Sequence, residues 1–184
     1  PAPRGAGAMP YAGAPGSDDE PPRPLSQIAA QPRFIAAVVA AMVAFGTMSF
    51  LMGASPLAIV ACGLPHTEAH WVIFLHLMGM FVPSFFSGNL IVRYGLARVM
   101  MAGIALMVLG VAAGLHGITD WHFRIALILN GVGWNFLFVG ATTLVTTCYR
   151  PSERGKTQAM NDFLIFGTTA AASFLAGYLQ QHFG

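Results

Sequence analysis

Five long apolar stretches dominate this chain and restrict what it can fold into. They cover approximately residues 34–62, 70–92, 97–116, 122–148 and 157–180. Each is close to the roughly 20 residues that an α-helix needs to cross about 30 Å of hydrocarbon. Within lipid, backbone groups are satisfied only in helices or closed barrels, and these stretches lack the apolar–polar alternation of barrel strands. The sequence therefore predicts an all-α fold, a polytopic transmembrane helical bundle with five membrane-spanning helices.

The composition excludes several other classes of protein. Only 9% of the 184 residues are charged, whereas soluble domains carry about 25%. The chain has nine basic and seven acidic residues, and its basic residues form no cluster in the sequence. We therefore expect no nucleic-acid partner. The sequence shows no nucleophile elbow, glycine-rich phosphate loop or paired carboxylates. We therefore expect a protein that is not an enzyme and has no cofactor.

The first 31 residues differ from the rest of the chain. They are rich in Pro, Gly, Ala and Ser and carry the acidic run Asp18, Asp19 and Glu20. Such a segment cannot bury enough apolar surface to offset its ordering entropy. We predict a disordered linker over residues 1–31 and a transmembrane helical domain over residues 32–184. Because the chain begins at Pro1 without a basic, apolar leader, we also expect it to be a fragment.

The basic residues predict how the helices are oriented. Eight of the nine fall in the leading segment and in the second and fourth connections: Arg4, Arg23, Arg33, Arg93, Arg98, Arg150, Arg154 and Lys156. By the positive-inside rule, these three segments are cytoplasmic. We expect a multi-pass protein of the plasma membrane, the inner membrane in a bacterium, with Cys62 and Cys148 at opposite faces.

Two segments of the chain resemble each other. Residues 83–95 read PSFFSGNLIVRYG, and residues 172–184 read ASFLAGYLQQHFG. The first copy ends the second helix and the second ends the fifth, so the two have opposite orientations in the membrane. This predicts an inverted 3+3 repeat, a construction typical of secondary transporters, with the sixth helix missing. The alternative is that glycine-rich membrane helices resemble one another by composition.

The loop after the second helix carries a recognisable motif. The run GNLIVRYGLAR, which includes Gly88, Arg93, Gly95 and Arg98, resembles the cytoplasmic loop motif of the major facilitator superfamily. The run RPSERGK, which ends at Lys156, is similar to the family's later loop. The resemblance implies helices seven to eleven of twelve, with the linker as the central cytoplasmic loop and the N-terminal half missing. Val92 and Ala97 depart from the motif's charged positions, which leaves a charge relay through this loop unsupported.

The resemblance also implies that the first and fourth helices line a central cavity. Asn130, Trp134 and Asn135 lie near the middle of the fourth helix, and polar groups deep in lipid often face a pathway. Trp134 with either Asn130 or Asn135 is our candidate set for substrate contact, because Asn130 and Trp134 share a helix face while Asn135 lies on a stripe rotated by about 100–140°. The alternative is that the Asn side chains bond across helices. In the first helix, the candidates are Thr47, Met48 and Met52. Pro56 in that helix predicts a kink that serves either as a gate hinge or for packing.

Two titratable residues within the predicted spans are candidates for a functional role. Asp162 is the only carboxylate within a predicted span, and we predict that it pairs with Arg93 or Arg154 as a latch of the inward gate or else contacts headgroups. His76 is a candidate proton-coupling group because of its titration range, or else an interfacial histidine. His66 and His70 have helical metal-pair spacing but lack a full ligand set, so we predict no metal site.

Together these features predict a secondary active transporter of a small solute that works by alternating access. Its expected partners are the lipid bilayer, the N-terminal half, an unknown small-molecule substrate and, as a candidate, a coupling proton. The alternative is a non-transporting membrane-anchoring or assembly module, in which the polarity of the fourth helix serves packing alone.

Overall fold

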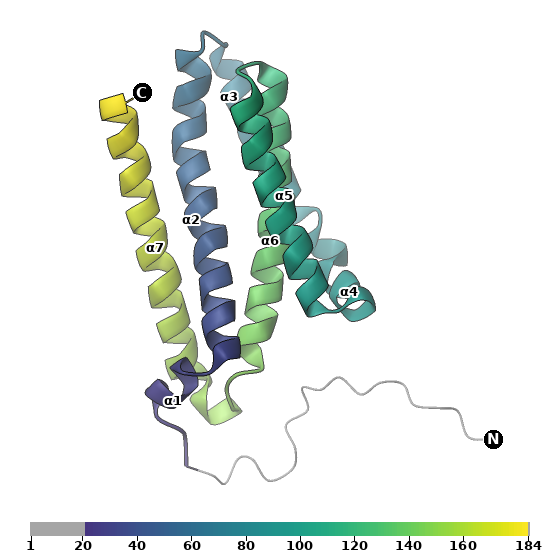
Figure 1. Cartoon of the computed structure of the whole chain (residues 1–184), viewed down its shortest axis with the longest axis vertical. Helices are drawn as coiled ribbons and strands as arrows, with labels where there is room; N and C mark the ends of the chain where they lie inside the picture. Colours follow the sequence, from purple (N-terminus) through teal and green to yellow (C-terminus); the bar gives the residue numbers. More distant parts are fainter. Residues whose placement is uncertain (1–20, 184) are drawn as a thin grey trace, which may run out of the picture.

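The computed structural model describes residues 21–183, and within that range it contains helices and no strands. The elements, in order, are α1 (Leu25–Ala29), α2 (Pro32–Ala61), α3 (His66–Phe81), α4 (Ser84–Tyr94), α5 (Leu96–His116), α6 (Asp120–Thr146), the 3-10 turn η1 (Pro151–Glu153) and α7 (Arg154–Phe183). Four of these helices are long and apolar enough to cross a membrane, and α3 with α4 forms a fifth, bent span. The structure confirms the predicted all-α bundle (Figure 1).

The second span is broken rather than continuous over residues 70–92 as predicted. Helix α3 ends at Phe81, α4 begins at Ser84, and their axes differ by 43°. Pro83 lies at the break, where its ring removes a backbone donor. Asn135 of α6 supports the break, because its Nδ2 donates to the Met80 carbonyl at 2.8 Å and to Ser84 Oγ at 2.6 Å. Helix α2, by contrast, continues through Pro56.

Helix α6 occupies the centre of the bundle and α7 its edge (Figure 1). Helix α6 packs against α2, α3 and α5, whereas the backbone of α7 comes close only to that of α2 among the membrane-crossing helices described. Buried residues make up 56% of the α6 span but 11% of the α7 span. The first helix thus pairs with the fifth, and the fourth with the second. Two inverted three-helix repeats would give this reciprocal packing.

Glycines let the backbone of α6 touch its neighbours. A Cβ atom on Gly131 would lie 2.5 Å from the His76 carbonyl oxygen of α3, and one on Gly133 would lie 2.7 Å from the Gly103 carbonyl oxygen of α5. Close approach of this kind is how small residues promote helix association in membranes. Helix α6 is therefore held by backbone contact on two sides.

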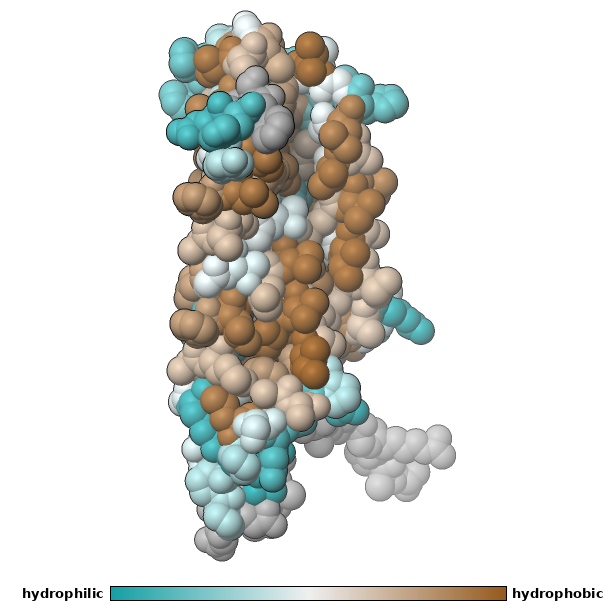
Figure 2. All heavy atoms as spheres, turned by 60° about the vertical axis from the view of Figure 1, so that its left-hand side comes forward, coloured by the Kyte–Doolittle hydropathy of each residue, from teal (hydrophilic) through white to brown (hydrophobic). Residues whose placement is uncertain are grey.

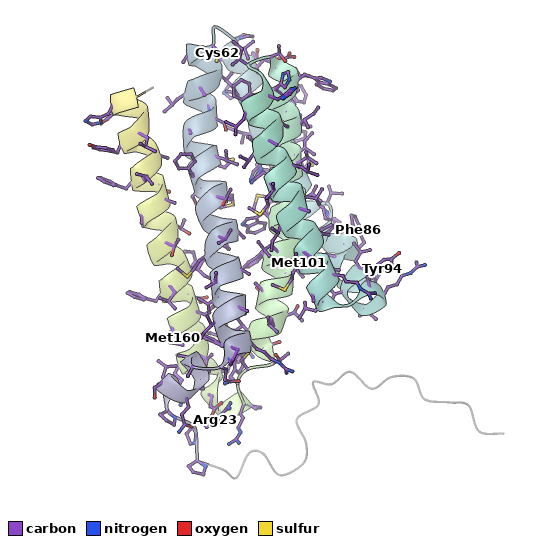
Figure 3. All side chains as sticks on the ribbon, in the orientation of Figure 1. Arg23, Cys62, Phe86, Tyr94, Met101 and Met160 are labelled. Atoms are coloured by element: carbon purple, nitrogen blue, oxygen red, sulfur yellow. The ribbon has the colours of Figure 1, made fainter. Side chains whose placement is uncertain are left out.

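An apolar belt lies between polar ends on the surface of the bundle (Figure 2). One end, the basic end, contains the start of α2, the α4–α5 turn and the α6–α7 connection, and it carries seven of the basic residues: Arg23, Arg33, Arg93, Arg98, Arg150, Arg154 and Lys156. The opposite end carries Cys62, which Figure 3 places far from Arg23. This arrangement is that of a multi-pass membrane protein.

Part of the segment predicted to be disordered is folded at the basic end. Helix α1 buries Ile28 completely against a cluster that includes Phe34 and Val145. Arg23 pairs with the fully buried carboxylate of Glu153, with an Nη2–Oε2 distance of 2.6 Å and an Nε–Oε1 distance of 2.9 Å. The backbone N–H groups of Arg23 and Arg150 also donate to this carboxylate. Residues 1–20 of the predicted linker lie outside the described residues.

Candidate functional site: a buried polar centre and an aromatic cluster

The polar residues of α6 lie inside the bundle. Asn130 is 0% exposed, Trp134 is 8% exposed, and Asn135 is 1% exposed. Asn135 donates hydrogen bonds to α3 and α4, as described above, and so helps to hold the helices together. Asn130 has no protein partner for Oδ1 or Nδ2 within the described part of the chain, and Trp134 Nε1 has none either. Buried polar atoms of this kind usually meet water or a ligand. Asn130 and Trp134 therefore remain the pathway candidates of this helix.

His76 lies in the α3–α6 interface, fully buried. Its Nδ1 is 2.9 Å from the Leu127 carbonyl oxygen. Because a carbonyl only accepts, Nδ1 carries the hydrogen of this bond. Nε2 has no partner among residues 21–183, so it is the nitrogen that can take up a proton. His76 is therefore enclosed by the bundle, and its role in proton coupling stays a prediction.

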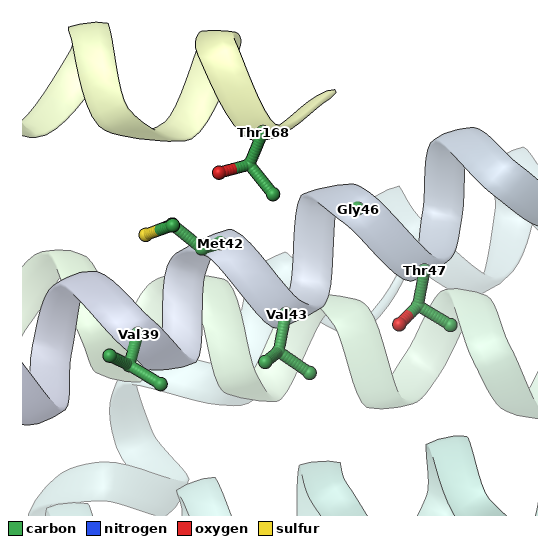
Figure 4. Close-up of a pocket in the computed structure, with 6 residues that line it drawn as sticks. All are labelled: Val39, Met42, Val43, Gly46, Thr47 and Thr168. Atoms are coloured by element: carbon green, nitrogen blue, oxygen red, sulfur yellow. The ribbon is translucent and has the colours of Figure 1, made fainter. Parts of the chain in front are cut away.

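The structure does not bring all six pathway candidates to one place. Met48 packs on a core cluster that contains Trp134 and Met80, while Met52 is half-buried on α2. Thr47 lines a shallow groove along α2 (Figure 4), and it also lines two hollows toward α5 and α6. The groove residues are Val39, Met42, Val43, Gly46, Thr47 and Thr168. Asn135 bonds instead to α3 and α4.

The loop-motif residues lie at the basic end as predicted. Gly95 joins α4 to α5 with a φ of 89°, a conformation that favours glycine. A Cβ on Gly88 would meet nothing within 4 Å, so packing does not require glycine there. The Arg93 guanidinium lies over the Tyr94 ring at 5.4 Å from its centroid. Arg98 and Arg154 are exposed.

Asp162 is exposed on α7, and its carboxylate accepts a hydrogen bond from Asn161 Nδ2 at 3.1 Å. Neither Arg93 nor Arg154 forms an ion pair with it within residues 21–183. The predicted latch is therefore not formed in this conformation and stays a prediction.

The α6–α7 connection also contains a cysteine whose reactivity the structure lowers. Burial raises the pKa of the Cys148 thiol, an effect that the hydrogen bond between Thr147 and Cys148 and the charges of Arg33 and Arg23 oppose in part. Since the thiolate is the reactive form, this cysteine is expected to react slowly. Cys62 at the other end is exposed.

Sequence reasoning found Trp134 but missed the aromatic cluster to which it belongs. Trp134 and Phe138 stack at 4.8 Å with an interplanar angle of 22°. Phe45 of α2 meets both rings edge-on at 5.2 Å, and it meets Phe166 of α7 at 6.3 Å. The four rings come from three helices far apart in the sequence, so no spacing pattern could have shown the cluster.

Helices long and apolar enough to cross a membrane, packed around buried polar groups, define the class of protein, a polytopic membrane protein. The sequence profile of the Major Facilitator Superfamily matches residues 37–184, and the chain belongs to this family. This confirms the resemblance seen in the loop motif.

Two relatives support the assignment. The chain is 45% identical to the riboflavin transporter RfnT of Brucella anthropi over 162 residues, which are 88% of this chain and 41% of that protein. It is 33% identical to the uncharacterized MFS-type transporter YddS of Bacillus subtilis over 137 residues, 73% of this chain and 31% of that protein. The chain thus spans less than half the length of these relatives. No solved structure matches.

These relatives carry the names of transporters rather than of enzymes or assembly subunits. The comparisons therefore point to a protein that is not an enzyme, and they give no support to the alternative of a membrane-anchoring or assembly module.

Proposed function

We propose that the intact protein is a secondary active transporter that moves a flavin, riboflavin or a close chemical relative, across the plasma membrane by alternating access. This chain supplies most of its C-terminal half. The observation that carries the proposal is the 45% identity to a relative named as a riboflavin transporter, which extends over 88% of the chain. The buried polar atoms of Asn130 and Trp134, which lack protein partners among the described residues, are consistent with a solute pathway beside α6.

Alternating access needs a second half against which this one can rock. Helix α7 contacts one membrane-crossing helix and leaves most of its surface open, which suits contact with an N-terminal half. The concentration of basic residues at one end supports a cytoplasmic location for that end in the inner membrane of a bacterium. Residues 1–31 then lie in the cytoplasm between the two halves.

Coupling to a proton is the second part of the proposal, and His76 is the group we assign to it. Its Nδ1–H is held by the Leu127 carbonyl, which leaves Nε2 to accept the proton. Protonation would place a charge in the α3–α6 interface, where it is costly without a partner. A proton on His76 would therefore favour a conformation in which this interface is open to water.

Uptake in whole cells tests the proposal. Bacteria that neither make nor import riboflavin would carry the intact gene, and uptake of labelled riboflavin would be measured with and without a proton uncoupler. We expect uptake that depends on the gene and falls with the uncoupler, and we expect the His76→Gln variant to lose its response to the uncoupler. Absence of riboflavin uptake from correctly inserted protein would contradict the substrate, and uptake insensitive to the uncoupler would contradict the coupling.

A further inference from the structure

Three rings of the aromatic cluster come from three different helices. Phe138 of α6 and Phe166 of α7 both lie steeply inclined to the ring of Phe45 of α2, with interplanar angles of 81° and 71° and centroid distances of 5.2 and 6.3 Å. Aromatic rings such as these are what a planar ligand ring stacks on.

This aromatic layer is accessible from outside the bundle. Phe166 is 61% exposed, and Phe45 and Phe138 are half-buried. The backbones of α6 and α7 do not contact each other in the described part of the chain, so only side chains fill the space between these two helices. Behind Phe138, the stacked Trp134 is 8% exposed and its Nε1 has no protein partner within residues 21–183. A buried indole N–H normally has one.

Polar side chains lie one helical turn from the aromatic layer, on both sides. Thr142 lies four residues after Phe138 on α6, and Asp162 lies four residues before Phe166 on α7. Residues four apart share a face of a helix. Because α6 runs toward the basic end and α7 runs away from it, both polar residues lie on the side of the basic end. Both are exposed, and they form a polar layer next to the aromatic one.

We propose that these two layers form a binding site for a flat heteroaromatic ring that bears a hydroxylated chain. The ring stacks between Phe138 and Phe166 on Phe45. The chain extends toward the basic end, where the Asp162 carboxylate accepts hydrogen bonds from its hydroxyl groups and the Thr142 hydroxyl donates to or accepts from them. The inference rests on the proposed transport of a flavin, and it adds which residues recognise which part of the solute.

This assignment gives Asp162 a role in binding that competes with its predicted role as a gate latch. A carboxylate that accepts hydrogen bonds from hydroxyl groups needs no arginine partner, and none is present among the described residues. Exchange of the charges of Asp162 and Arg154 separates the two roles, since it preserves a latch but destroys an acceptor of hydroxyl hydrogens.

Flavin fluorescence titrations of the purified intact transporter test the site. Three probes separate recognition of the ring from recognition of the polyol chain. They are riboflavin, lumichrome as the ring system without the polyol, and ribitol as the polyol without the ring. The variants are Phe166→Leu and Asp162→Asn. Phe163→Leu is the matched control, because Phe163 is 77% exposed on the same helix and takes part in none of the ring contacts described.

We expect Phe166→Leu to weaken binding of riboflavin and lumichrome about tenfold, the effect of losing one stacking partner. Asp162→Asn should weaken riboflavin several-fold and leave lumichrome unchanged. Phe166→Tyr, which keeps the ring, should bind both normally. If the unaltered protein binds riboflavin but the Phe166→Leu and Phe163→Leu variants bind it with equal affinity, the proposed site is wrong while the proposed function stands. Failure of the unaltered protein to bind either flavin probe would overturn the proposed function, and the site with it.

Discussion

Helices α6 and α7 are similar in length and both carry polar residues, yet they are packed in opposite ways. Residues buried in the bundle make up 56% of the α6 span and 11% of the α7 span. Glycines bring the backbone of α6 against α3 and α5, whereas α7 meets α2 along one stripe and is tied down at its basic end by Glu153. The presence of polar residues in a membrane helix therefore does not by itself indicate a solute pathway, because the packing of the helix decides whether they bond to other helices or face a solute.

The largest expected effect concerns the attachment of α7 at its basic end. Glu153→Gln removes one partner of a buried ion pair whose carboxylate is 0% exposed. Removing one partner from such a pair costs about 3–5 kcal/mol, and the partial exposure of Arg23 places the loss near the lower value. We expect a clear fall in the thermal unfolding temperature of the intact protein in detergent.

The ion pair of Glu68 and Arg124 at the opposite end is the matched control. Its side chains are 17% and 26% exposed, and Arg124 keeps Asp120 as a second carboxylate partner at 3.5 Å when Glu68 is changed. Glu68→Gln should therefore change the unfolding temperature much less than Glu153→Gln does. Equal effects of the two substitutions would show that Glu153 does not anchor α7.

Glycine substitutions test the second difference between the two helices. Gly131→Ala in α6 places a Cβ atom 2.5 Å from the His76 carbonyl oxygen, whereas a Cβ on Gly167 in α7 meets nothing within 4 Å. Overpacking of this kind costs about 1–3 kcal/mol, while alanine in an open helix position is neutral or stabilising. Thermal unfolding should show a loss for Gly131→Ala and none for Gly167→Ala. The reverse order would mean that α6 is not the enclosed helix.

A smaller effect is expected at the break between α3 and α4. Asn135→Ala removes the two hydrogen bonds that α6 donates to Met80 and Ser84. Hydrogen bonds between membrane helices are worth about 0.6 kcal/mol each on average, so we expect a loss of about 1 kcal/mol by thermal unfolding. Flavin binding, measured by fluorescence, should persist because Asn135 serves packing. Loss of flavin binding without loss of stability would show that Asn135 contacts the solute rather than serving packing.

The smallest difference is one of reaction rate between the two cysteines. Cys62 is exposed, while Cys148 is buried and the pKa of its thiol is raised. Maleimide should label Cys62 rapidly in detergent and Cys148 slowly. The rate at Cys148 should increase as the pH rises toward the thiol pKa, because the thiolate fraction increases. Rapid labelling of Cys148 near neutral pH would show that the basic end is open.

The sequence predicted the helical bundle well because the length of an apolar stretch directly reports a membrane crossing. It could not predict which proline breaks its helix, because Pro56 and Pro83 both lie within long apolar stretches. Helix α2 continues through Pro56, whereas the break at Pro83 is supported by the side-chain amide of Asn135 from α6. It placed Arg23 in a disordered linker, because its partner Glu153 lies 130 residues away. The position in the middle of the fourth helix likewise named Asn130, Trp134 and Asn135 as candidates, but it could not show that Asn135 bonds across helices while polar atoms of Asn130 and Trp134 have no protein partner among the described residues.

The most direct test of the account compares accessibility along α6 and α7 in the intact transporter in membranes. Single cysteines at each position of residues 130–142 and 159–171 would be introduced into a variant without Cys62 and Cys148, and then labelled with maleimide in the presence and absence of riboflavin. We expect no labelling at Asn135, whose amide joins α6 to α3 and α4, labelling at Thr142, Asp162 and Phe166, and protection of these three by riboflavin. Labelling at Asn135 with protection there, and no labelling on α7, would contradict the account.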